Sequence, residues 1–273
     1  MKYAFSTLAC PAWSVEEVVG AATDLGYDGV EFRLLDGEVI DPRVHRAQAE
    51  RAVASCRRSG VEVCAFDTVC RFNDPNRAER ERQVEELLHW IDLAHDLQVP
   101  RLRVFGGRDQ ARPSPAPSPD EGNTWVAASL RAVVPSAERA GVTVMLETHD
   151  AFSSAHRVAA VLQQVPSAHV AALWDSQHTH RVGERVEDVL HALGARLAHV
   201  HIKDARRRTP DGSEWEVVLL GEGEVPVREQ LDALHRHGYA GYLSVEWEWH
   251  PGRVAPEVAL AQHLAWLKAV PAR

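Results

Sequence analysis

The sequence lacks several features that would assign it to a simple class of protein. No apolar stretch approaches the length of a membrane-spanning helix, and the apolar run at the N-terminus is too short for a signal peptide. The four cysteines form no CxxC pair and no zinc-finger spacing, so a zinc site built on thiolates is not expected. We therefore predict a cytoplasmic protein with reduced thiols.

Positive charge is also scarce. The chain has 30 lysine and arginine residues against 39 aspartate and glutamate residues, and its net charge is −9. This balance argues against a nucleic acid or a membrane surface as the partner. The stretch GEGEVP (221–226) lacks the lysine and the spacing of a phosphate-binding loop, so we expect an unphosphorylated small molecule as the ligand.

What the sequence does contain is an alternation of short apolar runs with longer amphipathic ones, which is typical of βα units and a parallel sheet. The expected strands are residues 3–6, 29–33, 61–67, 101–105, 143–148, 170–175, 197–204 and 241–248. Eight strands favour closure into a (β/α)8 TIM barrel of the α/β class. No break in the pattern divides the chain, so we predict a single domain over residues 1–273.

The amphipathic runs have recognisable helix ends. Ser14 and Glu17 form a capping box before the first run, and Gly26 follows its end. Further helices are expected over residues 42–59, 76–98, 121–140, 226–237 and 256–269. The proline-rich connection 106–122 and the connection 203–225 are long for this fold, and each is either a lid at the C-terminal side of the barrel or a solvated linker.

The stretch LAHVHIKD (197–204) predicts a strand with one polar face. Because side chains alternate along a strand, His199, His201 and Lys203 share one face and the apolar residues between them share the other. Helices cover the outside of a barrel, so the polar face must point inward. Polar groups inside a fold need partners or a function.

Three other expected strands carry an inward carboxylate at their C-terminal ends. These are Glu147, Asp175 and Glu246, with Glu248 as a rival to Glu246 on the same face. The ends of parallel strands meet at one face of a barrel, where α/β folds build their sites. With His201 they offer three carboxylates and one imidazole, a set that suits one divalent cation, Mn²⁺ first and Mg²⁺, Co²⁺ or Zn²⁺ as alternatives. Any one of them alone would be an ordinary ion-paired residue.

Several histidines and charged residues near this set are candidates for substrate contact. His178 follows Asp175 by three residues and could bind a substrate oxygen or orient a ligand. His149 could line the cavity, although a hydrogen-bonded interior histidine explains it equally well. Lys203 could face the substrate or pair with Asp204.

Two further candidates come from other parts of the chain. Glu31 shares the inner face of the second strand with Arg33, where either a substrate contact or a buried ion pair is expected. Arg207 and its neighbour Arg206 could reach a substrate hydroxyl, or they could belong to a solvated basic run.

Five stretches resemble the sugar phosphate isomerase/epimerase group of the xylose isomerase-like barrel superfamily: LETHD (146–150), WDSQH (174–178), HVHIKD (199–204), GEGEVP (221–226) and LSVEWE (243–248). The resemblance covers nearly the whole chain. It implies a TIM barrel with one metal held by Glu147, Asp175, His201 and Glu246, and a dimer or tetramer of identical chains. It also implies that the two glutamates move the proton, that His178 contacts substrate and that Arg207 lies near the loop arginine of the family.

The first functional hypothesis is therefore a metal-dependent epimerase or isomerase of a keto-sugar or a related polyhydroxy ketone. In this chemistry the metal stabilises an enediolate while one glutamate removes a proton from one face and the other returns it to the opposite face. The alternative is a lyase that uses the same enolisation, either an enzyme similar to inosose dehydratase or one that eliminates a β-substituent from an oxidised glycoside.

Two other classes are less consistent with the sequence. An abasic-site DNA-repair endonuclease shares the superfamily barrel but needs a three-metal zinc site with extra histidines after the third and fourth strands and a DxH after the seventh. Here the third strand ends in AFDT, the fourth in FGG, and no DxH follows the seventh. A barrel that only binds a sugar, or acts as a subunit beside a catalytic partner, is the remaining alternative, and the presence of Glu147 and Glu246 argues against it.

Overall fold

Eight parallel strands close into a barrel in the computed structural model, which describes residues 1–108, 116–209, 212 and 214–270. Around the barrel the order is β1, β2, β5, β6, β7, β8, β9 and β12, and β12 pairs with β1 again. Their bounds are β1 Lys2–Ser6, β2 Gly29–Phe32, β5 Glu62–Arg71, β6 Arg101–Phe105, β7 Thr143–Glu147, β8 Val170–Asp175, β9 Leu197–Ile202 and β12 Tyr242–Val245. The predicted (β/α)8 barrel is confirmed.

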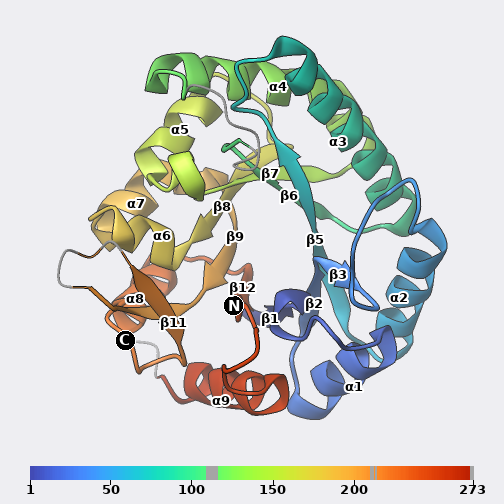
Figure 1. The fold of residues 1–273 in the computed structure, drawn as a ribbon, viewed down its shortest axis with the longest axis vertical. Helices are drawn as coiled ribbons and strands as arrows, with labels where there is room; N and C mark the ends of the chain where they lie inside the picture. The colour runs from blue at the N-terminus through green and yellow to red at the C-terminus, as the bar shows by residue number, and fades with distance from the viewer. Residues whose placement is uncertain (109–115, 210–211, 213, 271–273) are drawn as a thin grey trace.

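The helices form a ring around the strands (Figure 1). They are α1 Val15–Leu25, α2 Arg46–Arg58, α3 Arg77–Leu97, α4 Pro119–Ala140, α5 Ala155–Gln163, α6 Ser176–Arg181, α7 Val186–Leu193, α8 Val227–Arg236 and α9 Pro256–Ala269. The predicted capping box of α1 is present, and Gly26 takes a left-handed conformation at its end with φ of 81°. None of the described helices is long and apolar enough to cross a membrane.

Some helix boundaries differ from the expected ones. Helix α4 begins at Pro119, two residues early, because Ser118 and Glu121 form a capping box there. Helices α5, α6 and α7 were not predicted. They have 9, 6 and 8 residues, which is too short for apolar periodicity to identify them with certainty.

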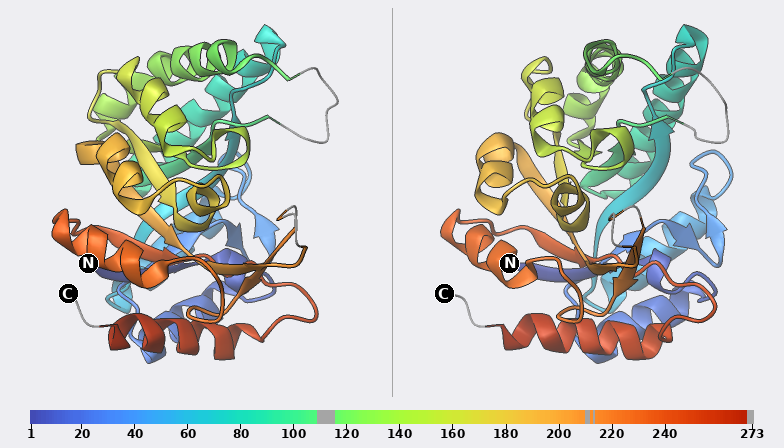
Figure 2. Two further views of the ribbon diagram at one scale, coloured as in Figure 1. Left: turned by 90° about the vertical axis from the view of Figure 1, so that its left-hand side faces the viewer. Right: turned by 60° about the vertical axis from the view of Figure 1, so that its left-hand side comes forward.

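Two hairpins extend the barrel on the side away from the N-terminus (Figure 2). One pairs β3 (Leu34–Leu35) with β4 (Glu38–Val39), and the other pairs β10 (Asp204–Arg207) with β11 (Trp215–Val218). The second hairpin occupies much of the long connection 203–225. Residues 109–115 of the proline-rich connection lie outside the described residues.

Asp204 anchors the second hairpin. Its carboxylate accepts hydrogen bonds of 2.8–3.1 Å from the backbone N–H groups of Ala205, Gly221, Gly223 and Val225. A carboxylate with this many backbone donors needs no further cation. The alternative that Lys203 pairs with Asp204 is therefore wrong, because Lys203 contacts other carboxylates.

The core has two parts that differ in polarity. Outward side chains of the strands, such as Val144, Leu146, Val200 and Leu243, are fully buried against the helices. Burial of each such side chain contributes roughly 1.5–3 kcal/mol. Inside the barrel, small apolar clusters fill the N-terminal part. Toward the C-terminal ends of the strands the buried side chains are charged or ionisable, and they include Glu31, Arg103, Glu147, Asp175, His201 and Glu246.

Candidate metal centre

Four buried side chains converge inside the barrel from four consecutive strands. Glu147 ends β7, Asp175 ends β8, His201 lies on β9, and Glu246 follows β12. Each is at most 5% exposed, and the four offer ligand atoms that all lie within 4.8 Å of one another. Each side chain points inward because of the alternation along its own strand. The four meet only because the strands close into a barrel.

The ligand atoms of this group face one another without hydrogen bonds. His201 Nδ1 lies 3.4 Å from Glu147 Oε1 and 3.3 Å from Glu246 Oε2. Among the described residues, the Lys203 ammonium is the one group outside the set at hydrogen-bond distance from any of these atoms or from Asp175 Oδ2, and Glu147 Oε1 and His201 Nδ1 have no well-formed hydrogen bond. Buried polar atoms in such a cluster are unfavourable unless they share a cation. The donor set, three carboxylates and an imidazole, fits a divalent metal ion.

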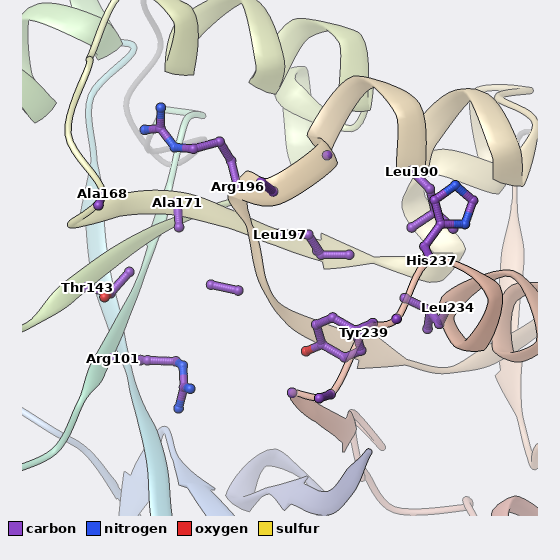
Figure 3. A pocket seen from close by; sticks show the side chains of 16 residues that line it. Arg101, Thr143, Ala168, Ala171, Leu190, Arg196, Leu197, Leu234, His237 and Tyr239 are labelled. Carbon is purple, nitrogen blue, oxygen red and sulfur yellow. The ribbon is translucent and has the colours of Figure 1, made fainter.

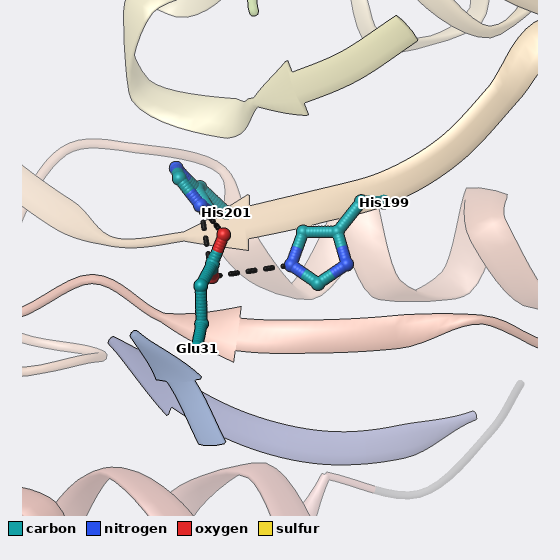
Figure 4. Close-up of side chains that lie close together, drawn as sticks. All are labelled: Glu31, His199 and His201. Atoms are coloured by element: carbon teal, nitrogen blue, oxygen red, sulfur yellow. Dashed lines mark hydrogen bonds and ion pairs between the residues drawn. The ribbon is translucent and has the colours of Figure 1, made fainter. Parts of the chain in front are cut away.

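The other nitrogen of His201 is held by Glu31 (Figure 4). Glu31 Oε1 and Oε2 lie 3.0 and 3.1 Å from His201 Nε2, and Oε2 lies 3.2 Å from His199 Nε2. All three side chains are fully buried. Because a carboxylate only accepts hydrogen bonds, we assign the hydrogen of each neutral imidazole to Nε2. This tautomer directs the lone pair of His201 Nδ1 toward Glu147 and Glu246.

The carboxylates around His201 favour a positive charge at this position, which a proton on His201 supplies when no metal ion is bound and which a metal ion on Nδ1 would supply in its place. Burial by itself would lower the pKa of His201, but Glu31 and Glu246 raise it well above its ordinary value. Burial would raise the pKa of Glu246, and Lys203 and His201 instead hold it well below its usual range. For Glu147 burial would raise the pKa, but Arg103, His149 and His201 together outweigh burial and lower it to about 2. The carboxylates of Glu147 and Glu246 are thus ionised at neutral pH and available as ligands.

Lys203 directly contacts the set of Glu147, Asp175, His201 and Glu246, which we call the metal-ligand group. Its Nζ lies 2.9 Å from Asp175 Oδ2, 2.5 Å from Glu246 Oε2 and 3.2 Å from Glu248 Oε1. The ammonium is buried, whereas the Glu248 side chain is 52% exposed. Glu246 rather than Glu248 therefore joins the group, and Lys203 links the two glutamates.

His149 and His178 form a pair beside Glu147. Their ring centroids are 4.6 Å apart in an edge-to-face arrangement, and His149 Nδ1 lies 3.1 Å from Asp150 Oδ1. Burial opposes a charge on His149, but Asp150 and Glu147 raise its pKa, while burial lowers the pKa of His178. One imidazole of the pair favours the charged form and the other the neutral form, which suits contact with a polar ligand.

Asp175 has a second role in placing His178. Its Oδ1 accepts hydrogen bonds of 2.9 Å from the backbone N–H groups of Gln177 and His178, and so caps helix α6. The other oxygen, Oδ2, faces the metal-ligand group. One carboxylate thus orients both the candidate metal site and the helix that carries His178.

Arg207 lies outside this group. It is exposed on β10, where its Nε lies 3.2 Å from Glu224 Oε2 and its guanidinium lies 5.5 Å from the ring centroid of Trp215. The structure therefore brings together all the predicted site residues except Arg207, which lies on the β10–β11 hairpin.

Sequence reasoning missed Arg103. Its Nε lies 3.3 Å from Glu147 Oε2, its Nη2 lies 3.5 Å from Asp67 Oδ2, and its guanidinium stacks 4.0 Å from the ring of Phe105. Arg103 is 1% exposed. The alternation in RLRVF (101–105) puts Arg101, Arg103 and Phe105 on one face, and this signal could have found it.

A cavity of about 770 Å³ opens at the opposite, N-terminal end of the barrel (Figure 3). Arg101, Thr143, Ala171 and Tyr239 are among the residues that line it. Its lining has no aspartate or glutamate. Its lining includes His237 but none of the carboxylates that converge at the other end of the barrel.

A closed parallel barrel with a buried set of metal-ligating side chains at the C-terminal ends of its strands defines the class of this protein. The chain belongs to the xylose isomerase-like TIM barrel family, whose model matches residues 19–270.

Individual relatives agree with this assignment. Fructoselysine 3-epimerase from Escherichia coli O157:H7 is 24% identical over 252 residues, which cover 90% of each chain. Inosose dehydratase from Bacillus licheniformis is 29% identical over 99 residues, which cover 32% of this chain and 33% of the relative. The crystal structure of the IOLI protein with a binding zinc atom superposes with a TM-score of 0.83 at 19% identity and covers 99% of this chain and 98% of that one. The relatives found by sequence thus include an epimerase and a dehydratase.

Proposed function

We propose that this protein is a divalent-metal-dependent epimerase or isomerase of a keto-sugar or a related polyhydroxy ketone. The observation that carries the proposal is the convergence of four buried side chains, Glu147, Asp175, His201 and Glu246, whose ligand atoms lie within 4.8 Å of one another with Lys203 as the one cation paired to two of them among the described residues. The two glutamates come from the outermost of the four strands, β7 and β12, and so flank the set on two sides. Mn²⁺ is the first candidate for the metal, with Mg²⁺, Co²⁺ or Zn²⁺ as alternatives.

The chain supplies the groups that such a reaction needs. When bound, the metal polarises the substrate carbonyl and acidifies the neighbouring C–H bond. Glu147 or Glu246 takes the proton from one face, and the other glutamate returns a proton to the opposite face. Return to the same carbon inverts it, and return to the adjacent carbon isomerises the ketone. Lys203 stabilises the negative charge that develops on oxygen.

The surrounding residues have supporting roles in this proposal. His178 and His149 hold substrate hydroxyls at the edge of the metal-ligand group. Glu31, which is fully buried against two histidines, orients His201 rather than contacting the substrate. Arg207 reaches the substrate only if its pair with Glu224 opens.

One observation favours a lyase as the second candidate. The buried ammonium of Lys203 lies beside Glu246 and could donate a proton to a departing oxygen after the same enolisation. The similarity to inosose dehydratase supports this alternative over part of the chain. Both candidates begin with removal of a proton from carbon, and they differ in whether a substituent leaves.

The test is proton exchange at a substrate carbon. Protein loaded with Mn²⁺ is incubated in D₂O with a panel of keto-sugars and inosose, and each is followed by NMR and mass spectrometry. We expect deuterium to enter with the mass otherwise unchanged, whereas loss of water or of a β-substituent would support the lyase. Glu147→Gln and Glu246→Gln should each abolish exchange, and Glu248→Gln is the matched control because Glu248 contacts Lys203 but lies outside the metal-ligand group. Exchange that persists in both glutamine variants would exclude the two-glutamate mechanism.

A further inference from the structure

A group of arginines lies beside the candidate metal centre at the C-terminal end of the barrel. The metal-ligand group occupies the consecutive strands β7, β8, β9 and β12. The next three strands around the barrel are β6, β5 and β2. Arg103 lies on β6, Arg71 ends β5, and Arg33 follows β2 directly. At this end of the barrel these strands therefore hold three arginines together with the buried acids Glu31 and Asp67.

Two of these three arginines have their charge balanced by a carboxylate. Arg71 Nη1 lies 2.7 Å from Asp150 Oδ2, and Arg103 Nε lies 3.3 Å from Glu147 Oε2. Their guanidinium groups both stack on Phe105, at 4.1 and 4.0 Å from the ring centroid. This stacking holds both groups in fixed positions.

Arg33 is different because no described carboxylate forms an ion pair with it. Its backbone N–H donates to Thr7 Oγ1 at 2.9 Å, and its Nη1 donates to the backbone carbonyl of Asp67 at 3.3 Å. These contacts hold the residue at the end of β2 while leaving most of its guanidinium donors available. Arg33 therefore carries a partly buried positive charge that no direct ion pair among the described residues balances, although Asp67 and Glu147 are near enough to act on it.

The neighbouring charges agree with this imbalance. Burial and the nearby cation Arg103 lower the pKa of Arg33 to about 10. Burial and the nearby carboxylate of Glu31 raise the pKa of Asp67 well above its ordinary value, so Asp67 favours its neutral form. Asp67, whose backbone carbonyl accepts the hydrogen bond from Arg33, thus contributes less negative charge than an ionised carboxylate would.

We infer that Arg33 binds an anionic group of the substrate, a carboxylate or a phosphate, at the end of the molecule remote from the carbonyl. A substrate that spans the candidate metal centre and the arginines would present its carbonyl and neighbouring hydroxyl to the metal-ligand group and its anion to Arg33. A guanidinium is suited to such groups because it can donate two parallel hydrogen bonds to them. This inference rests on the proposed function, and it narrows the substrate to a keto-acid sugar or a sugar phosphate.

The experiment compares ligands that differ only in the terminal group. Isothermal titration calorimetry measures the Kd of Mn²⁺-loaded protein for D-fructose, for D-fructuronate, in which a carboxylate replaces the terminal hydroxymethyl group, and for D-fructose 6-phosphate. We expect at least one anion to bind roughly 10- to 100-fold more tightly than D-fructose, as one charge-assisted hydrogen-bonded pair implies. The two anions distinguish a carboxylate from a phosphate.

Variants assign any preference to Arg33. Arg33→Met should remove the difference between anion and D-fructose while leaving the Kd for D-fructose unchanged, and Arg33→Lys should retain part of it. Arg236→Met is the matched control, because Arg236 ends α8 at the other end of the barrel and pairs with Glu187. The preference should persist in this control.

The outcomes separate this inference from the proposed function. Equal affinity of the wild-type protein for the three ligands, or a preference that persists in Arg33→Met, overturns the anion site. Tight binding of an anion without deuterium exchange overturns the proposed reaction but supports the site. Absence of binding by all three ketoses overturns both.

Discussion

At the scale of single residues, the candidate metal centre depends on two side chains that hold its ligands in place without belonging to the ligand set. Glu31 holds His201 from its Nε2 side, and Arg103 holds the Glu147 carboxylate. Metal-binding histidines commonly donate their second N–H to a carboxylate, which sets the tautomer and the ring orientation. Both residues can be tested apart from catalysis.

The first prediction concerns Glu31→Gln. Glutamine cannot accept from both His199 and His201 with the same oxygens, because one of its two positions becomes an N–H donor. We expect the affinity for Mn²⁺ to fall by about 10- to 100-fold, as for other residues that orient a metal ligand. Electron paramagnetic resonance of free Mn²⁺ measures this. Glu62→Gln, at the start of β5, is the control, and an unchanged affinity in Glu31→Gln would contradict the orienting role.

The second prediction concerns Arg103→Met. This change leaves the buried Glu147 carboxylate without its guanidinium partner, and breaking a buried ion pair from one side costs about 3–5 kcal/mol. Because a bound cation would replace part of the lost charge, Mn²⁺ should raise the Tm of this variant more than that of the wild-type protein. Calorimetry in EDTA and in MnCl₂ measures both shifts.

The surface variant Arg46→Met is the control for this experiment, since Arg46 pairs with Asp96 on the outer helices. An equal loss of Tm in Arg103→Met with and without Mn²⁺ would show that Arg103 and the metal do not share Glu147.

At the scale of secondary-structure elements, the coupling between β8 and α6 is the most informative. The helix follows the strand without a loop, and Asp175 serves both as the last strand residue and as the helix N-cap. A local cap and a candidate metal ligand therefore share one side chain. This also explains why α6 was not predicted, since no turn residue separates it from the strand.

The third prediction separates these two roles of Asp175. Asp175→Asn keeps an oxygen that can accept from the N–H groups of Gln177 and His178, whereas Asp175→Ala removes it. Both variants lose the carboxylate, so both should bind Mn²⁺ weakly. Only the alanine variant should lose a further 1 kcal/mol or so of stability, a typical value for an N-cap. Urea unfolding in EDTA measures this difference, and equal stabilities would contradict the capping role.

At the scale of the whole molecule, the stability of the barrel depends on pH through His263, a buried histidine outside the candidate metal centre. His263 on α9 is 2% exposed, packs at 5.4 Å from the ring of Trp247, and accepts from the Leu220 N–H through Nδ1 at 3.4 Å. Burial lowers its pKa to about 4 from an ordinary 6.5. Between these values the unfolded chain binds a proton at this position and the folded chain does not.

The fourth prediction follows from the direction of this pKa shift. The stabilisation due to neutral His263 is complete above pH 6.5 and is lost as the pH falls toward 4, by up to about 3 kcal/mol. His263→Asn keeps an acceptor for the Leu220 N–H and removes the titrating ring. We expect its stability to fall less between pH 7 and 4.5 than that of the wild-type protein, measured by urea unfolding in EDTA. Parallel pH dependence in the two proteins would contradict the prediction.

Much of the fold could be predicted from the sequence because strand signals are local. Alternation with a period of two residues marked the eight strands and the inward parity of Glu147, Asp175, His201 and Glu246. Helices with caps and several turns were found in the same way, whereas α5, α6 and α7 were too short. Arg103 was missed, although its parity is inward, because nothing local in the chain connects it with Glu147.

The sequence by itself therefore determined the barrel and the direction in which its inner side chains point. Only the tertiary structure decided which of those side chains meet. It joined Glu31 to His201 across 170 positions, brought Lys203 to Asp175 and Glu246 rather than to Asp204, and left Arg33 without a carboxylate partner among the described residues. The physical reason is that alternation is set by each strand alone, whereas these contacts depend on the closure and register of the whole barrel.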